Sequence, residues 1–340
     1  MPGFLAFKGY APGSPLENAK LPVPFERIEK RSHISSRRLA FSQETITSMG
    51  VEVVNRLRQI LHLPARDSGG LVLSSCSPNV PRHAQSIAKL INLPDDAEVV
   101  GINAACCGFL AATQRAASIV EATRRPVFVI ASELLHELVD YSDESTAFLF
   151  GDFAAGSVIA DQGRHEILNV LYRSVDDPKH LLGMESVPNA LDVHGRVARR
   201  QCIRMPGGRD LYRDAHKIML RMVNEGIERW NTEHANAPLD SNDIAALVPH
   251  QGNGTITHNL EKLLLSSAWS QSPPLVMNRI HHMGNVGSAG IPAVLAAMEE
   301  EDPLWPGALV ACPGLGAGED MADGQLTEGN LLIRWDADRI

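Results

Sequence analysis

Short apolar runs alternate with longer stretches of helical periodicity along most of this chain. In the first half, strands are predicted at 70–75, 98–102 and 126–131, and helices at 82–93 and 108–123. In the second half, strands are predicted at 244–248, 275–277, 308–311 and 330–335, and helices at 255–265 and 292–299. Strands that alternate with helices indicate βαβ units and a mostly parallel sheet. The chain is therefore expected to be an α/β protein.

Two segments differ from this alternation. The stretch from His165 to Arg200 is polar and lacks a regular period, so we expect a joint together with loops that face a substrate. The helix 108–123 carries Ala111, Ala112, Ala116 and Ala117, which are small enough for close packing. That helix is expected to be central and buried.

The run Asn103-Ala104-Ala105-Cys106-Cys107-Gly108-Phe109 places a thiol where a predicted strand turns into this helix. Unpaired backbone N–H groups and the positive end of the helix dipole favour the thiolate at such a corner. Cys106 is thus a candidate nucleophile. A free cysteine is also often a buried packing residue, and this is our interpretation of Cys107.

Two further motifs follow in chain order, Val248-Pro249-His250-Gln251-Gly252-Asn253 and Gly284-Asn285-Val286-Gly287-Ser288-Ala289. His250 follows a predicted buried strand, and Asn285 lies between glycines that let the backbone approach a ligand closely. Cysteine, histidine and asparagine together are the parts of an activated-thiol acyl-transfer site.

These three motifs, in this order, resemble the 3-oxoacyl-ACP synthase III family, the ketosynthase III branch of the thiolase superfamily. The segments 150–156 and 313–318 also resemble family segments, and the likeness spans nearly the whole chain. The resemblance implies a thiolase-like fold with duplicated halves stacked as five αβαβα layers. No repeat between the halves is visible in the sequence, and we expect residues 1–170 to carry the cysteine and 171–340 the histidine and asparagine.

The resemblance also implies an enzyme, an acyltransferase that forms carbon–carbon bonds, in fatty-acid or polyketide biosynthesis. An acyl group from acyl-CoA or an acyl carrier is loaded onto Cys106 and condensed with a malonyl-type thioester by a decarboxylative Claisen reaction. His250 and Asn285 donate hydrogen bonds to the extender thioester as the enolate forms. The backbone N–H groups of Cys106 and of Leu315 or Gly316 form the oxyanion hole. An acyl carrier protein is an expected partner, and so is a second copy of the chain, with the strand 127–131 as the candidate edge of a homodimer.

Composition narrows the classes of function further. The net charge of −9 argues against general nucleic-acid binding, which requires a basic field. The five cysteines are irregularly spaced without a Cys-x-x-Cys pair, so a disulfide framework is not expected and a reducing compartment fits. No run reaches the roughly 20 apolar residues of a membrane helix, and no signal peptide is recognised at the first residues. The sequence therefore predicts a soluble, cytoplasmic protein without a membrane partner.

Candidate substrate-binding residues form a weaker set. Basic residues cluster at 30–38 and along 204–217, where they could meet the phosphates of coenzyme A or an acidic carrier. Separately, the backbone of the glycine-rich segment 313–318 is expected to form a corner. The candidates are Arg31, Arg38, Arg209, Arg213 and Gly314. His281 and His282 suggest no metal site, because adjacent side chains point apart and no further ligand lies at suitable spacing. No cofactor is expected.

The chain departs from the family at the expected entrance. The stretch 24–34 lacks the family's tryptophan and its glycine before the isoleucine, and Gly254-Thr255 replaces a basic residue often found after the histidine motif. An acidic loop is predicted at 319–324. These changes suggest an enzyme of specialised metabolism more than a housekeeping initiator of fatty-acid synthesis.

Three alternatives compete with this interpretation. A papain-type peptidase shares the order Cys, His, Asn, and the gap from Cys106 to His250 falls within its range of about 130–150 residues, but its local cysteine motif is absent. An acyltransferase that passes the acyl group to an oxygen or nitrogen nucleophile often loses the asparagine, so Asn285 favours carbon–carbon bond formation. A non-catalytic partner subunit would not need all three residues.

Overall fold

The computed structural model describes residues 2–21, 29–30, 32–301, 304–321 and 324–336. Its main sheet has the strand order β12-β11-β13-β14-β8-β1-β7-β6-β4-β5. The two halves of this sheet are joined through a short antiparallel pairing of Gly3 with Glu166 and Phe4 with His165. The strands of the first half are β1 (Pro2–Tyr10), β4 (Gly70–Ser74), β5 (Glu98–Ile102), β6 (Val127–Leu134) and β7 (Asp152–Asp161). Those of the second half are β8 (His165–Asp176), β11 (Ile244–Leu247), β12 (Leu275–Val276), β13 (Leu309–Ala317) and β14 (Gln325–Arg334).

The two halves have the same topology, strand for strand. The order β5-β4-β6-β7-β1 in one half matches β12-β11-β13-β14-β8 in the other. In each half, the first three of these strands are parallel and the last two run antiparallel to their neighbours. The duplication that the sequence does not display is therefore present in the fold. The second half begins with β8, a few residues before the expected boundary at 170.

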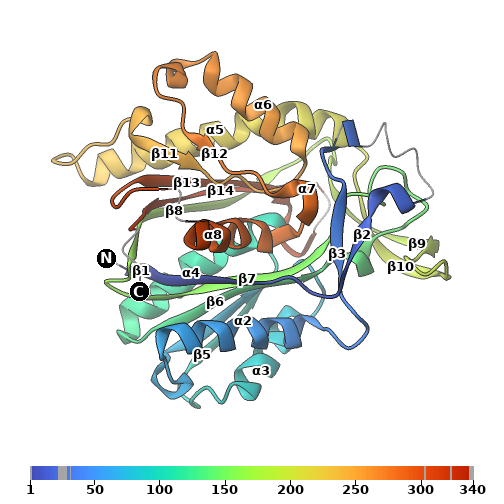
Figure 1. Ribbon diagram of the computed structural model, residues 1–340, viewed down its shortest axis with the longest axis horizontal. Helices are drawn as coiled ribbons and strands as arrows, with labels where there is room; N and C mark the ends of the chain where they lie inside the picture. Colours follow the sequence, from blue (N-terminus) through green and yellow to red (C-terminus); the bar gives the residue numbers. More distant parts are fainter. Residues whose placement is uncertain (1, 22–28, 31, 302–303, 322–323, 337–340) are drawn as a thin grey trace.

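Helices complete five layers, as Figure 1 shows. The helices α4 (Gly108–Thr123) and α8 (Gly290–Glu301) lie between the two half-sheets. The outer layers consist of α2 (Ile46–Leu61) with α3 (Val80–Leu90), and of α5 (Gly208–Glu233) with α6 (Gly254–Leu265). A short helix, α7 (Ile280–Met283), precedes Asn285. The predicted thiolase-like αβαβα fold is confirmed.

Short helical turns connect these elements. They are η1 (Asn18–Lys20), η2 (Ala65–Asp67), η3 (Ala105–Cys107), η4 (Leu135–Leu138), η5 (Ser241–Asp243), η6 (Ala268–Gln271), η7 (Gly287–Ala289) and η8 (Glu319–Met321). Two small sheets lie outside the layers. One pairs β2 (Ser14–Glu17) with β3 (Ser36–Leu39), and the other is a hairpin of β9 (Gly183–Leu191) and β10 (Val197–Arg204).

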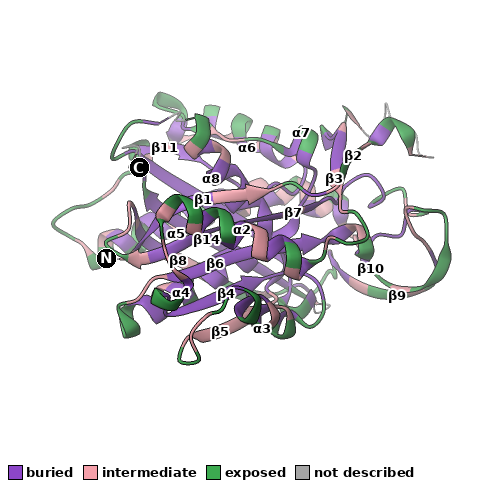
Figure 2. Cartoon of the chain, turned by 60° about the horizontal axis from the view of Figure 1, so that its bottom comes forward, coloured by how far each residue is buried: buried purple, intermediate pink, exposed green. Residues whose placement is uncertain are grey.

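Burial explains the layered order. The central core consists of apolar side chains from α4, α8 and both half-sheets, among them Phe4, Phe109 and Val294. Figure 2 shows buried residues concentrated in the sheets and central helices, and exposed residues on the outer helices and at the end of the hairpin. The small side chains of α4 permit this position, as its sequence predicts. Among the described helices, none is long and apolar enough to cross a membrane.

Three sequence-based expectations about local structure were wrong. The stretch 165–200 contains β8 and most of the β9–β10 hairpin, where the outward faces of strands are polar and hide the alternation. The strand 127–131 is internal, because β6 lies between β4 and β7, and the sheet edges are β5 and β12. The glycine-rich segment 313–318 is no corner, because β13 continues to Ala317 with unbroken antiparallel pairing to β14.

Candidate active site

The three candidate catalytic residues line one cavity. It lies between the ends of the central helices, α5 and the β9–β10 hairpin. Its walls are almost entirely apolar. Cys106, His250 and Asn285 come together there with Cys76, Gly252, Gly287 and a wall of Leu135, Phe150, Leu182, Ile203, Met205, Leu211, Tyr212, Ala215, Met219, Ile256, Leu315, Ala317 and Met321.

Cys106 lies in the turn η3 between β5 and α4. The preceding residue, Ala105, has φ of 46°, a left-handed conformation that is unusual for alanine and typical of strained functional turns. Burial, then the nearby Cys107 and Glu133, raise the pKa of the Cys106 thiol, and only a backbone hydrogen bond lowers it. The expected thiolate is therefore not the resting state. Cys107 is fully buried with Sγ 3.5 Å from the Thr327 carbonyl oxygen, which fits its interpretation as a packing residue.

The backbone of His250 is held by the middle of β13. Its backbone N–H donates to the Pro313 carbonyl at 2.9 Å, and Gly252 N–H donates back to the His250 carbonyl at the same distance. Burial lowers the pKa of His250 to about 4, so the imidazole is neutral at physiological pH. Within the described part of the chain, Nδ1 has no hydrogen-bond partner. A neutral imidazole in an apolar cavity can donate one hydrogen bond to a substrate oxygen.

Asn285 is fixed on both its backbone and its side chain. Its N–H donates to the Leu149 carbonyl, and its carbonyl accepts from Gly151, each at 2.9 Å. The Gly287 N–H donates to Asn285 Oδ1 at 2.9 Å, and Gly287 has φ of 55°. This bond turns Oδ1 toward Gly287, so the NH2 group on the other side of the amide is the part of Asn285 that can donate to a substrate.

The turns that carry Cys106 and Asn285 are equivalent in the two halves. The turn η3 leads into α4, and η7 leads into α8. Ala105, with φ of 46°, corresponds to Gly287, with φ of 55°, so Cys106 corresponds to Ser288. A Cβ on Gly108 would lie 3.0 Å from the Cβ atoms of both Ser288 and Ser74. The two turns therefore pack directly against each other.

The glycines of β13 serve this packing. A Cβ on Gly316 would lie 2.8 Å from both the backbone nitrogen and the Cβ of Cys106. Gly314 faces Cys107 Sγ and Leu110 on the core side, and it does not line the cavity. Leu315 lines the cavity beside Cys106. Leu315 and Gly316 thus lie next to Cys106, whereas Gly314 packs on the core side.

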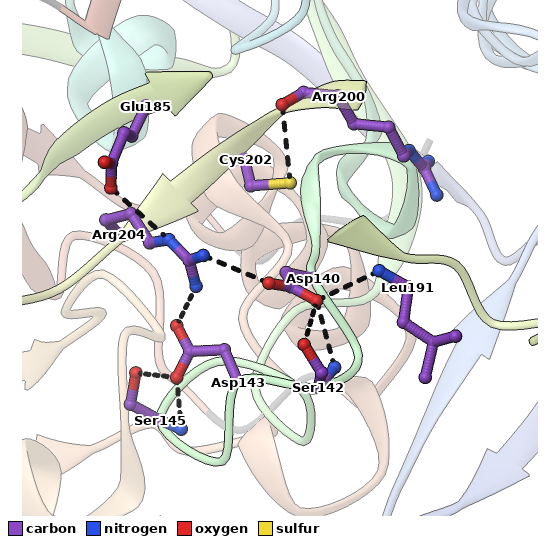
Figure 3. Close-up of polar contacts among 9 residues, drawn as sticks. All are labelled: Asp140, Ser142, Asp143, Ser145, Glu185, Leu191, Arg200, Cys202 and Arg204. Carbon is purple, nitrogen blue, oxygen red and sulfur yellow. Dashed lines mark hydrogen bonds and ion pairs between the residues drawn. The ribbon is translucent and has the colours of Figure 1, made fainter. Parts of the chain in front are cut away.

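A network of ion pairs holds the hairpin wall in place (Figure 3). Arg204 lies between the cavity-lining Ile203 and Met205, and its guanidinium contacts Asp140 at 3.0 Å and Asp143 at 2.6 Å. Asp140 also accepts the Leu191 N–H at 3.1 Å, so it binds both strands of the hairpin. Sequence inspection did not find this wall, because its residues come from distant segments.

The candidate substrate-binding arginines are dispersed. Arg31 lies outside the described residues, as does most of the stretch 24–34. Arg38 donates to the carbonyl oxygens of Pro12 and Gly13, which occupies its guanidinium. Arg209 is exposed at the start of α5, and Arg213 pairs with Asp210 and Asp214, both at 2.8 Å.

The region near the expected entrance carries histidines. His33 occupies the position of the family's glycine and has a left-handed φ of 56°. His281 Nδ1 lies 3.1 Å from the His33 carbonyl oxygen, and His282 Nδ1 lies 3.2 Å from Ser36 Oγ. No set of three or more His, Cys, Asp or Glu side chains suited to a metal ion occurs among the residues that the structure describes.

Comparisons with known proteins point to one enzyme family. Residues 100–175 match the family model for 3-oxoacyl-[acyl-carrier-protein] synthase III, and residues 234–326 match the model for the C-terminal part of the same enzyme. A β-ketoacyl-[acyl-carrier-protein] synthase III from Chlorobium chlorochromatii is 27% identical over 344 residues, covering 97% of this chain and 98% of the relative.

Two solved structures extend the likeness to the fold. The 3-oxoacyl-[acyl-carrier-protein] synthase III of Aquifex aeolicus superimposes with a TM-score of 0.80 and 25% identity, covering 98% of this chain and 100% of that one. The priming β-ketosynthase of the R1128 polyketide pathway superimposes with a TM-score of 0.78 and 26% identity, covering 99% of this chain and 97% of that one. The chain belongs to the 3-oxoacyl-[acyl-carrier-protein] synthase III family of the thiolase superfamily and is a condensing enzyme of the ketosynthase III type.

Proposed function

We propose that the enzyme carries an acyl group on Cys106 and condenses it with a malonyl-type thioester. The observation that carries this proposal is the convergence of Cys106, His250 and Asn285 on one cavity with apolar walls. Such walls favour an aliphatic acyl group, because burying a polar or charged one without partners costs free energy.

The first step is exchange of a thioester. The Cys106 sulfur bonds to the acyl carbon, the bond from that carbon to the donor sulfur breaks, and the thiol proton passes to the departing thiolate. Because the resting thiol is protonated and His250 is neutral, proton loss accompanies the attack. Backbone N–H groups at Cys106 and at Leu315 or Gly316 stabilise the tetrahedral oxyanion.

The second step forms the carbon–carbon bond. The malonyl carboxylate leaves as carbon dioxide, and the electron pair of the broken bond becomes an enolate on the extender thioester. His250 and the Asn285 amide donate hydrogen bonds to the enolate oxygen. The enolate carbon then attacks the acyl carbon on Cys106, the carbon–sulfur bond breaks, and the thiolate takes up a proton.

The partners follow from this chemistry. Acyl-CoA and a malonyl thioester are the proposed substrates, and an acyl carrier protein is the proposed macromolecular partner. The exposed Arg209, on the same helix as Leu211 and Tyr212 of the cavity wall, supports docking of an acidic carrier there. The departures at 24–34 and at Gly254-Thr255 support a role in specialised metabolism.

We propose that the enzyme is a homodimer paired through β5, because the internal position of β6 leaves β5 and the two-residue β12 as the sheet edges. Val99, Val100 and Ile102 of β5 are only partly buried in the single chain. Light scattering at micromolar concentration should give twice the mass of 36.9 kDa, and a monomer would contradict the proposal.

Intact-protein mass spectrometry with a panel of acyl-CoAs, combined with release of labelled carbon dioxide from malonyl thioesters, tests the reaction. An adduct on the wild type that is absent from Cys106→Ala and present on Cys107→Ala is expected. If wild type forms the adduct, releases no carbon dioxide and instead acylates an alcohol or amine, the enzyme is an oxygen or nitrogen acyltransferase.

A further inference from the structure

A fully buried carboxylate lies beside the active site and has no role in the proposed reaction. Glu133, near the end of β6, is 0% exposed. Its Oε1 accepts the Ser288 N–H at 3.0 Å and the Ser288 hydroxyl at 2.5 Å. Its Oε2 accepts the Cys76 N–H at 2.8 Å and the Ser75 hydroxyl at 3.1 Å. The Cys76 thiol lies 3.4 Å from Oε1.

The two backbone contacts require a carboxylate. One oxygen faces the N–H of Ser288 and the other faces the N–H of Cys76, so both must act as acceptors. A glutamine offers one acceptor and one NH2 group, and either orientation would set a donor against one of the two backbone N–H groups. A buried charge is costly unless its hydrogen bonds are satisfied, and here each oxygen has at least two donors.

On one side, Glu133 acts on the turn that orients Asn285. Ser288, which it binds, directly follows Gly287, and Gly287 holds the Asn285 side chain through Oδ1. Gly287 itself leaves no free space, because a Cβ there would lie 3.0 Å from Glu133 Oε1. A displaced carboxylate would therefore move the bond that aims the Asn285 amide.

On the other side, the same contacts reach the Cys106 corner. Ser74 at the end of β4 donates to the Ser288 hydroxyl at 3.1 Å, and Gly108 packs against both serines. Gly108 is the first residue of α4 and lies two positions after Cys106. Glu133 thus joins the end of β4 to the Asn285 turn at the place where the two turns meet.

We propose that Glu133 is a positioning residue that fixes the Asn285 turn against the Cys106 corner, so that the Asn285 amide faces the extender thioester. The test of this proposal by carbon dioxide release rests on the proposed function. The charge has a second effect, because Glu133 contributes to raising the pKa of the Cys106 thiol, after burial and Cys107.

The test compares Glu133→Gln and Ser288→Ala in the full chain with Glu299→Gln as the matched control. The Glu299 side chain is only 7% exposed; it accepts the Phe7 N–H at 2.9 Å, binds His165 and does not line the cavity. Adduct formation, carbon dioxide release, thermal unfolding and the pH profile of Cys106 alkylation by iodoacetamide, mapped by mass, are measured for each.

In Glu133→Gln the Asn285 amide should be displaced, so carbon dioxide release should fall by about 100-fold. Adduct formation should change little. Ser288→Ala keeps the contact between its backbone N–H and Glu133, and its carbon dioxide release should fall roughly tenfold. Alkylation of Glu133→Gln should reach its half-maximal rate at lower pH than wild type. Glu299→Gln should leave the ratio of decarboxylation to loading and the alkylation profile unchanged.

The proposal is overturned if Glu133→Gln releases carbon dioxide at the wild-type rate, or if loading and release fall together as stability falls. If Glu133→Gln does not fold, an unchanged ratio of decarboxylation to loading in Ser288→Ala overturns the proposal instead. If the wild type forms no acyl adduct, the proposed function fails. The crystal structure of Glu133→Gln then decides, because an unmoved Asn285 turn would overturn the positioning role and a displaced turn would support it.

Discussion

Gly316 lies so close to Cys106 that a single added carbon would stand 2.8 Å from the Cys106 backbone nitrogen and Cβ. Backbone atoms cannot yield as the end of a flexible side chain can, so Gly316→Ala must displace the turn that carries the thiol. We expect a loss of about 1–3 kcal/mol in the free energy of unfolding from overpacking, and a loss of adduct formation. Gly314→Ala on the same strand is the matched control, because it meets only the ends of Cys107 and Leu110. Normal loading by Gly316→Ala would refute this argument.

The donor of Asn285 can be removed without changing its shape. Asn285→Asp keeps an oxygen that accepts the Gly287 N–H, and it replaces the amide NH2 with a second acceptor. We expect the Cys106 adduct to form and carbon dioxide release to fall by about 100-fold or more, the scale of one lost oxyanion donor. His250→Ala should also lose release, with slower loading if the imidazole assists proton transfer. Loss of the adduct in Asn285→Asp would assign Asn285 to the loading step instead.

Burial of His250 makes stability depend on pH. Its pKa is about 4 in the folded protein and about 6.5 unfolded. The unfolded chain therefore binds the proton first as pH falls, so the stability from this group is complete above pH 6.5 and is lost between about 6.5 and 4. Near pH 4 the loss amounts to about 3 kcal/mol. Urea unfolding of wild type and His250→Gln at pH 7 and pH 4.5 should show a smaller decrease in the variant, and equal decreases would contradict the assignment.

Arg204 should influence which acyl chains are accepted. Replacing it by Met leaves the buried Asp140 without its cation, which costs roughly 3–5 kcal/mol, and it removes the ion pairs that hold the hairpin wall at Ile203 and Met205. We expect a flatter dependence of loading on acyl chain length and a lower Tm. Arg204→Lys should restore part of the preference. Arg196→Gln is the control, because its pair with Asp192 lies at the exposed end of the hairpin. An unchanged chain-length profile in Arg204→Met would show that the wall does not depend on the ion pairs.

The parts of the site that were visible in sequence are those encoded locally. Cys106, His250 and Asn285 each lie in a short motif next to a strand, and the strand 98–102 and helix 108–123 begin and end as their apolar patterns predict. The glycines of β13 were misinterpreted as a corner because the residues that require them are distant in the sequence. Cys106 and Cys107 occupy the space beside these positions and leave no room for a larger side chain.

The cavity wall and Glu133 could not be found in the same way. The wall collects residues from η4, the hairpin, α5 and α6, and no local period links them. In the sequence, Glu133 is a single acidic residue near the end of an apolar strand, and nothing next to it indicates a special role. Only the tertiary structure shows that its two oxygens meet the N–H groups of Cys76 and Ser288.

The central position of α4 and α8 has a consequence for folding. Each helix is covered by the half-sheets on both sides, so a half of the chain produced alone would present its central helix and one apolar sheet face to water. The nucleophile belongs to one half and its two partners to the other. We therefore expect the duplicated architecture to fold as one cooperative unit, in which neither copy is a domain in the sense of a part that can fold and function separately.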